Sequence, residues 1–550
     1  MKKNIVFADF ETTQPDENGI VEVYLWCLIS GKRKYSGRTI SEFYDFTKTR
    51  KDICYFHNLK FDFSYLQYFL IKNGIKYDIL EKKGVIYSVK YGGFEIRDTL
   101  NFLPMTLKEI GENYCTRYKK TSIEHINQRG HIATSEEIEY CFNDCLVLQE
   151  GFNNYMSALT EVLDMAGCEK TIKRLGRKMT NAGIAFNAFK ELSLYEEMCP
   201  KTTQEEFKLF RKAYKGGYVY SAPRGIKKNI RMIDANSMYP YIYANEPMPV
   251  GKPHPCDYKD PRYDFFILKI MCNYSIKAGY IPIIGGGVGK WGGTEYRTHS
   301  DTPIDELVVC SIDLDLIEEF YDIDYAVLWC YGFKTKPQFF KKYADTFINF
   351  KNQFKGVKRA VCKVLLNSPY GKTAMNGFNE IKNYYIDEIT NTIKSECVGY
   401  EVDDTAYQYL PMAIAITAGA RRLLLNTAKE IGFDKVQYMD TDSIKFEDCE
   451  VPFDFDPDTL GAWKDEGLAE LFKTIAPKKY ATWCEGELNL TCAGFNKSVL
   501  TEQMKHGAKC TKDEALQVMT MFDTGLTLDC LQSKIVVGGR ALLNVKKEIK

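Results

Sequence analysis

The chain has 550 residues, of which 45% are hydrophobic and 14% aromatic, and its 73 basic residues balance 73 acidic ones. This is the composition of a globular protein of several domains, and its zero net charge gives no indication of a nucleic-acid partner. The 18 cysteines include no Cys-x-x-Cys pair and are accompanied by only six histidines, which excludes the common zinc sites and a compact disulfide framework.

The first predicted element is an apolar strand at residues 5–8, which ends in Asp9-Phe10-Glu11. On an extended strand, side chains two residues apart point the same way, so Asp9 and Glu11 share a face. Such a pair is either a surface feature or half of a metal site. The two acids also interrupt the apolar start, and no later run approaches about 18 apolar residues, so we expect neither a signal peptide nor a membrane span.

Two further acids follow on predicted helices. A strand at residues 53–56 leads into a helix with Asp62 at its entrance, where the alternative interpretation is an N-cap. Residues 134–137 have the capping-box pattern that opens a helix, and on it Tyr140 and Asp144 share a face. Acids on strand, loop and helix could hold two divalent cations for phosphodiester hydrolysis, with Tyr140 orienting the attacking water.

The second half of the chain contains another acidic turn. Alternating apolar residues at 436–446 surround Asp440-Thr441-Asp442, which predicts a β-hairpin. Two acids this close repel each other unless a cation lies beside them, so the turn is either solvated or a magnesium site. A strand at residues 230–233 leads to Asp234, which could supply the third acid of such a site.

A basic helix is predicted between residues 350 and 371. Every fourth residue lies on one stripe of this helix, namely Lys355, Arg359, Lys363 and Asn367. A basic stripe is usually a solvated face. If the stripe instead faced a triphosphate, its cations would neutralise the charge that builds on the leaving pyrophosphate.

Taken together, these patterns resemble the motifs of a known enzyme family. The first four acids lie in patterns similar to the D-x-E, N-x-x-(F/Y)-D and Y-x-x-x-D exonuclease motifs of proofreading DNA polymerases. Motifs A (D-x-x-S-L-Y-P, with Met238 for Leu), B (K-x-x-x-N-S-x-Y-G) and C (Y-x-D-T-D-S) follow, and then K-x-Y. Their order is that of family B DNA polymerases, and two long intervening segments resemble the insertions of the protein-primed phage type.

The resemblance assigns roles in a 3′–5′ exonuclease site. It implies metal ligands at four acids: Asp9, Glu11, Asp62 and Asp144. Tyr140 and Lys120, the latter in a K-x-x-h pattern, would assist catalysis. The implied contacts with the single-stranded primer end are Thr12, Asn58, Phe61, Thr99 and Leu100.

The resemblance likewise assigns roles in a polymerase site. Asp234 and Asp442 would hold two metal ions, with Asp440 as a supporting acid and Lys363 as the catalytic cation. The implied nucleotide contacts are Tyr239, which would exclude a 2′-hydroxyl, Lys351, Arg359, Lys363, Asn367 and Tyr370. The implied DNA contacts are Tyr214, Gly216 and Gly217 of a Y-x-G-G segment, and Lys478 and Tyr480 of the K-x-Y motif.

The expected fold is α/β and multidomain. It combines an RNase H-like exonuclease domain with a right-hand polymerase of palm, fingers and thumb and with two insertions in the terminal-protein region. The expected bounds are exonuclease 1–168, palm 169–243 and 407–505, insertion 1 (priming-protein contact) 244–339, fingers 340–374, insertion 2 (processivity and strand displacement) 375–406, and thumb 506–550.

The resemblance also implies cofactors and partners. We expect two Mg²⁺ ions per active site, replaceable by Mn²⁺, and as partners template-primer DNA, dNTPs and a terminal protein. The protein is expected to be a monomer in the cytoplasm of an infected bacterium, without membrane contact. Two alternatives are a family B polymerase primed by nucleic acid alone, and a non-catalytic DNA-binding relative, which would lack the metal-binding acids.

Overall fold

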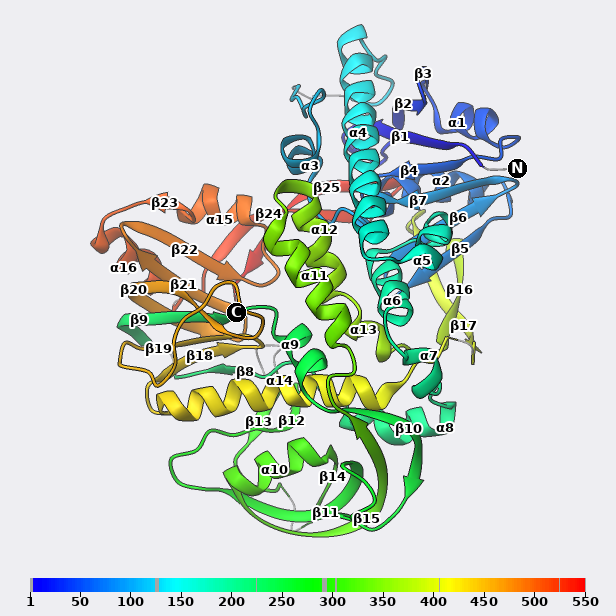
Figure 1. Cartoon of the computed structure of the whole chain (residues 1–550). Helices are drawn as coiled ribbons and strands as arrows, with labels where there is room; N and C mark the ends of the chain where they lie inside the picture. The colour runs from blue at the N-terminus through cyan, green and yellow to red at the C-terminus, as the bar shows by residue number, and fades with distance from the viewer. Residues whose placement is uncertain are drawn as a thin grey trace.

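The computed structural model describes residues 3–123, 128–223, 225–288, 294–301, 304–404, 406–523 and 525–549. Two large β-sheets, one from the N-terminal part of the chain and one from its second half, lie on opposite sides of a group of helices (Figure 1). Within the described residues, no helix is long and apolar enough to cross a membrane.

The N-terminal sheet has seven strands in the order β3-β2-β1-β4-β7-β6-β5. Its strands are β1 (Ile5–Thr12), β2 (Val23–Ser30), β3 (Arg33–Gly37), β4 (Ile53–Phe56), β5 (Asp78–Lys82), β6 (Val85–Tyr91) and β7 (Phe94–Asp98). Strand β1 pairs antiparallel with β2 and parallel with β4, so it lies inside the sheet. The side chains of β1 up to Ala8 are buried from Val6 on, whereas those of Asp9 and Glu11 are only partly buried.

Helices cover this sheet and continue beyond it. They are α1 (Ile40–Thr47), α2 (Leu59–Lys72), α3 (Leu107–Tyr114), α4 (Ser135–Met165), α5 (Glu169–Lys173), α6 (Asn181–Glu191), α7 (Tyr195–Met198) and α8 (Gln204–Phe210). The long α4 packs on β1 and β2 and begins with the predicted capping box of Thr134 and Glu137. Its length lets it contact the sheet near one end and the central helices further along (Figure 1).

The second sheet has eight strands in the order β23-β22-β21-β20-β9-β19-β18-β8. Its strands are β8 (Val219–Ser221), β9 (Gly225–Ala235), β18 (Val436–Asp440), β19 (Ser443–Glu447), β20 (Trp463–Ala476), β21 (Lys479–Cys484), β22 (Glu487–Cys492) and β23 (Ala508–Lys509). The apolar helix α14 (Leu410–Ile431) contacts β19 and the short helix α9 (Met238–Asn245). Strands more than two hundred residues apart in sequence, β9 and β19, are therefore neighbours.

The segment expected to be the first insertion forms a separate sheet in the order β10-β15-β11-β14. Its elements are β10 (Met248–Pro255), β11 (Phe265–Ile276), β14 (Asp305–Cys310), α10 (Ser311–Phe320) and β15 (Tyr321–Lys336), with a hairpin of β12 (Ile284–Val288) and β13 (Thr294–Arg297). Helix α14 lies between this sheet and the eight-stranded one (Figure 1). The expected domain bounds themselves stay predictions.

The basic stretch differs from the single helix that was expected. It forms two helices, α11 (Lys341–Gln353) and α12 (Gly356–Asn367), followed by the short α13 (Tyr370–Thr373). The break comes at Phe354 and Lys355, which are extended, and at Gly356, whose φ of +56° suits glycine. Lys355 is therefore the N-cap of α12 and not a member of the helical stripe.

Two hairpins reach back to the N-terminal sheet. They are β16 (Phe378–Ile386) with β17 (Ile393–Val402), in the expected second insertion, and β24 (Thr527–Val536) with β25 (Gly539–Glu548), which follows α15 (Lys497–Met504) and α16 (Lys512–Met521). Lys382 of the first hairpin forms a 2.7 Å ion pair with Glu81. In the second, Ala541 is buried in the core of the N-terminal sheet, and the Tyr65 hydroxyl donates to the carbonyl of Arg540.

Candidate functional site

Four acids from three elements form the first acidic site, which we define as Asp9, Glu11, Asp62 and Asp144. Strand β1 supplies the first two, the first turn of α2 supplies Asp62, and α4 supplies Asp144. The last two side chains are buried. A thiol also faces the site, because ligand atoms of Asp9, Glu11 and Cys141 all lie within 4.8 Å of one another.

The electrostatics of the first acidic site favour a bound cation. Burial, and next the charge of Asp144, raise the pKa of Asp9 to about 7. Burial and the charge of Asp9 also raise the pKa values of Glu11 and Asp62. In addition, the buried Oδ1 of Asp144 has no hydrogen-bond partner among the described residues. Hard oxygen ligands that repel one another fit divalent cations of the magnesium type.

Two other predicted residues lie beside this site. The ammonium group of Lys120 forms an ion pair with Asp144 and donates a 2.5 Å hydrogen bond to the hydroxyl of Tyr140. It also lies 4.3 Å from the centre of the Tyr140 ring. The structure thus brings the three residues together, although Lys120 comes from an irregular segment between α3 and α4.

The second acidic site lies where β9 meets the predicted hairpin, and we define it as Asp234 and Asp442 with Asp440. The hairpin of β18 and β19 places Asp440 opposite Ser443, and Ser443 in turn lies opposite Asp234. The backbone N–H of Ala235 donates to the carbonyl of Asp442 at 2.7 Å. Sheet pairing therefore holds the Asp234 and Asp442 backbones side by side.

Asp234 and Asp442 differ from Asp440 in their surroundings. Burial, and next Asp442, raise the pKa of Asp234 to about 6, and burial raises the pKa of Asp442. Neither carboxylate forms an ion pair with any residue that the structure describes. By contrast, both oxygens of Asp440 accept hydrogen bonds of 3.0 Å from the Lys478 ammonium. Asp234 and Asp442 therefore have the greater need of a divalent cation.

Basic residues of the helix pair α11–α12 lie near the second acidic site. Lys351 is buried and donates a 3.1 Å hydrogen bond to the side-chain carbonyl of Asn236, two residues after Asp234. The guanidinium of Arg359 donates to the Lys351 carbonyl at 2.6 Å, while Lys363 is exposed. Burial, followed by the neighbouring Arg359, lowers the pKa of Lys351. This cluster of cations fits an anionic ligand such as a triphosphate.

Comparison with known proteins identifies the family. The family model described as "DNA polymerase type B, organellar and viral" matches residues 44–134 and 127–452. The DNA polymerase of Bacillus phage Nf is 30% identical over 521 residues, covering 87% of both chains. That of Bacillus phage phi29 is 29% identical over 522 residues, covering 87% of this chain and 86% of its own. The chain is a family B DNA polymerase.

The fold agrees with this assignment. A solved structure described as phi29 DNA polymerase complexed with primer-template DNA and incoming nucleotide substrates matches with a TM-score of 0.85 at 24% identity, covering 100% of both chains. The predicted fold class is confirmed. The predicted enzyme class, a DNA-directed DNA polymerase with a 3′–5′ exonuclease, is confirmed as well. The family uses divalent cations, which both acidic sites fit.

The predicted nucleotide contacts of the polymerase lie on the helices α9, α11, α12 and α13. The rings of Tyr239 and Tyr370 are stacked, with centroids 4.1 Å apart and planes inclined by 25°. Asn367 ends α12, and its side-chain amide donates to the Lys363 carbonyl at 2.9 Å. The stacked pair forms an aromatic surface next to the acids, and the nucleotide-binding role of these residues stays a prediction.

The Y-x-G-G segment contacts the hairpin of β18 and β19 directly. A Cβ added to Gly217 would lie 2.4 Å from the hydroxyl of Thr441, so only glycine allows this approach. The K-x-Y residue Tyr480 packs its ring 5.0 Å from that of Tyr438. Two of the predicted DNA contacts, Gly217 and Lys478, therefore lie against the turn that bears Asp442, and Tyr214 and Gly216 belong to the same segment as Gly217.

A buried ion pair that the sequence did not reveal supports this segment. Arg421 of α14 and Asp313 of α10 form hydrogen bonds of 2.7–3.0 Å, with both side chains less than a tenth exposed. The same guanidinium donates to the carbonyls of Lys215 and Gly216 at 2.9 and 2.8 Å. Although burial opposes ionisation of Asp313, the charge of Arg421 lowers its pKa.

Removing this guanidinium should destabilise the polymerase strongly. We expect Arg421→Met to lower the free energy of unfolding by about 3–5 kcal/mol, because it leaves the buried Asp313 carboxylate unpaired. The matched control is Arg422→Met, whose partner Glu246 and own side chain are each about one-third exposed, and it should cost less than about 1 kcal/mol. Urea denaturation measures both, and equal losses would refute the role of the buried pair.

A second buried acid, which no motif of the sequence indicates, holds together the segments with the predicted primer contacts. The carboxylate of Asp98 accepts hydrogen bonds of 2.9–3.0 Å from the backbone N–H groups of Asn58, Leu59 and Leu100. It thus joins the two segments that carry the predicted primer contacts, including Thr99. Phe61 lies in the first turn of α2 and Thr12 at the end of β1. An aspartate directly before a Thr-Leu pair is the only signal in the sequence.

Proposed function

We propose that the second acidic site performs DNA synthesis. Asp234 and Asp442 would hold two Mg²⁺ ions, which supply acidity for the primer 3′-hydroxyl and neutralise the charge of the leaving pyrophosphate. The cations Lys351, Arg359 and Lys363 bind the triphosphate and stabilise its developing charge. The observation that supports this most is the sheet pairing that holds Asp234 and Asp442, two half-buried carboxylates without an ion-pair partner among the described residues, side by side.

We further propose that the first acidic site removes mispaired nucleotides from the primer end. Its four acids would hold two Mg²⁺ ions, replaceable by Mn²⁺ as at the polymerase site. The Tyr140 hydroxyl and the Lys120 ammonium, which are in contact, orient the attacking water and balance the negative charge of the site. The segments that Asp98 joins bind the single-stranded end.

The partners follow from the polymerase type. We infer that the enzyme binds template-primer DNA and dNTPs, works as a monomer in the cytoplasm of an infected bacterium, and starts strands from the hydroxyl of a terminal protein. The separate β10–β15 sheet, which follows α9 and precedes the basic helices in the chain, would offer a surface for that protein. The hairpin β16–β17 would act in processivity and strand displacement.

Protein priming is tested by incubating the enzyme with labelled dATP, template and a candidate priming protein. We expect label that remains attached to the protein under denaturing conditions. Replacing the priming hydroxyl residue of the candidate, or Asp442 of the polymerase, should abolish the labelled band. If label enters DNA only when an oligonucleotide primer is added, whichever candidate protein is supplied, the enzyme is a nucleic-acid-primed family B polymerase.

A further inference from the structure

The segment that delivers Lys120 to the exonuclease site has no regular secondary structure. It runs from the end of α3 at Tyr114 to Lys120, whose ammonium reaches Asp144 and Tyr140. A side chain on such a segment is placed only as well as the backbone that carries it. The contacts that hold this backbone therefore bear on the position of the Lys120 charge.

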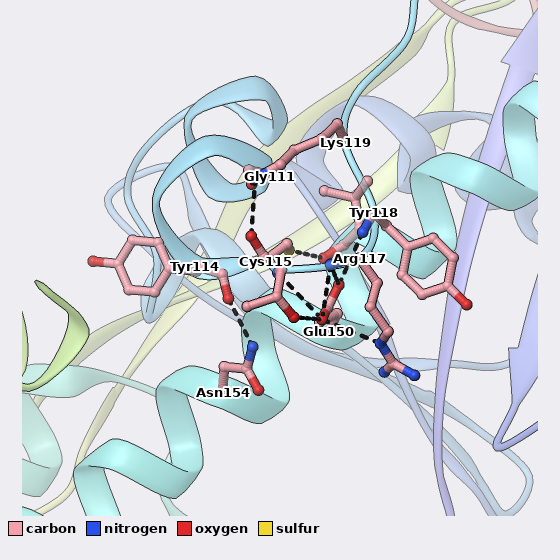
Figure 2. Close-up of polar contacts among 10 residues, drawn as sticks. Gly111, Tyr114, Cys115, Arg117, Tyr118, Lys119, Glu150 and Asn154 are labelled. Atoms are coloured by element: carbon pink, nitrogen blue, oxygen red, sulfur yellow. Dashed lines mark hydrogen bonds and ion pairs between the residues drawn. The ribbon is translucent and has the colours of Figure 1, made fainter.

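One buried carboxylate provides most of these contacts. Glu150 of α4 is 6% exposed, and it accepts hydrogen bonds from three successive backbone N–H groups, those of Thr116, Arg117 and Tyr118, at 3.1–3.3 Å. The hydroxyl of Thr116 and the Nε of Arg117 donate to the same carboxylate at 3.0 and 3.3 Å (Figure 2). Burial would raise the pKa of Glu150, but these hydrogen bonds lower it, so they favour the charged form.

Other residues on the same stripe of α4 complete the attachment. The stripe consists of Asn143, Val147, Glu150 and Asn154, spaced four, three and four residues apart, so it follows one face of the helix. The amides of Asn143 and Asn154 donate at 2.8 Å to the carbonyls of Lys119 and Tyr114. Cys115 donates its thiol hydrogen to the Val147 carbonyl at 3.3 Å.

The beginning of the segment is fixed as well. A Cβ added to Gly151 of α4 would lie 2.3 Å from the side chain of Ile110, so α3 packs tightly against α4. The Lys119 ammonium donates to the carbonyls of Gly111 and Cys115 at 2.6 and 2.9 Å, which satisfies acceptors at the end of α3 (Figure 2). Lys119 thus stabilises the end of α3, and the ammonium of its neighbour Lys120 is the one that reaches the acidic site.

We propose that Glu150 is a positioning residue of the exonuclease: it fixes the backbone before Lys120 on α4, so the ammonium stays beside Asp144. Helix α4 thus carries both Asp144 and, six residues further on, Glu150, which holds the segment that bears Lys120. This inference rests on the proposed exonuclease function of the first acidic site. Among the described residues, Glu150 itself forms no hydrogen bond or ion pair with the four acids or with Lys120.

The direct test is Glu150→Gln, which keeps the size of the side chain but replaces acceptors with an N–H₂ donor that faces other donors. We expect degradation of a labelled single strand to fall by about 10–100-fold, as for outer partners of metal ligands. Incorporation of dNTPs on a primed template should stay at the wild-type rate. The matched control is Glu139→Gln on the same helix, because Glu139 is 72% exposed, and it should change neither activity.

Action through Lys120 is tested by a double-mutant cycle. In a Lys120→Ala background, Glu150→Gln should cause no further loss of degradation, because the cation to be positioned is already absent. A further loss of the same size would show a general structural role and overturn the proposal. A readout independent of activity is amide exchange in EDTA, where the peptide covering residues 116–118 should exchange faster in Glu150→Gln than in Glu139→Gln.

Two further variants serve as a substitute for Glu150→Gln and as a reference for the exonuclease function. If Glu150→Gln fails to fold, Thr116→Val removes one donor to the carboxylate, and unchanged degradation in that variant would refute the proposal. Asp9→Ala with Asp62→Ala serves as the reference for the exonuclease function itself. If this reference variant still degrades single strands, the proposed function is wrong. If it does not, while Glu150→Gln equals Glu139→Gln, only the positioning role is wrong.

Discussion

Asp442→Asn should abolish dNTP incorporation while single-strand degradation continues at the wild-type rate. Asparagine keeps the shape of the turn but removes one of the two carboxylates that sheet pairing brings together, that of Asp442 in the turn before β19 and that of Asp234 at the end of β9. We expect a loss of at least about 10²–10³-fold, as when a stabilising group is removed from a transition state. Primer extension and degradation of a labelled single strand, measured on the same preparation, give the two rates.

Two comparisons sharpen this prediction. Asp440→Asn should reduce synthesis less than Asp442→Asn, because the charge of Asp440 is already balanced by Lys478. The exposed Asp434 lies outside the site, so Asp434→Asn serves as the matched control and should change nothing. Normal synthesis by Asp442→Asn would contradict the assignment of the metal site, and equal losses from the Asp440 and Asp442 variants would contradict the distinction between them.

The second large effect is a loss of exonuclease activity, expected from changes in the first acidic site. Asp9→Ala combined with Asp62→Ala should abolish degradation of single strands and leave the rate of synthesis unchanged, because the two acidic sites are built from different sheets. The double variant should also incorporate more mispaired nucleotides. Degradation of a 5′-labelled oligonucleotide and extension from a mismatched primer measure these effects.

The control for this double variant is Asp45→Ala with Asp78→Ala. Both of these aspartates are exposed and lie on α1 and β5 of the same N-terminal unit. If the control loses as much degradation as the double variant, the effect is one of stability rather than of the first acidic site. Persistent degradation by the double variant would show that the nuclease activity resides elsewhere.

Much of this architecture could be predicted because its signals are local. The hairpin at 436–447 follows from alternating apolar residues, and the start of α4 from its capping box. The acids of each site could be grouped because each lies in a short pattern of its own. The structure brings the acids of each site together, as those patterns predicted, and their catalytic roles stay predictions.

The parts that could not be predicted depend on backbone atoms or on distant partners. Glu150 and Asp98 act mainly on backbone N–H groups, which leave no pattern in the side chains, and Arg421 binds two backbone carbonyls and Asp313, which is 108 residues away in the chain. The break before Gly356 was missed because the four-residue spacing from Lys355 onward suits a continuous helix. Only the positive φ at Gly356 and the packing of α11 against α12 reveal two helices.

The packing of Ala541 among the residues of the N-terminal sheet has a consequence for biosynthesis. Tyr65 and its acceptor Arg540 are 475 residues apart in the chain. At a translation rate of about 5–20 residues per second, β25 is synthesised on the order of a minute after the N-terminal sheet whose core it completes. During that time the face of α2 that β25 will cover is exposed on the nascent chain, so release from the ribosome, and not emergence of the first domain, completes its folding.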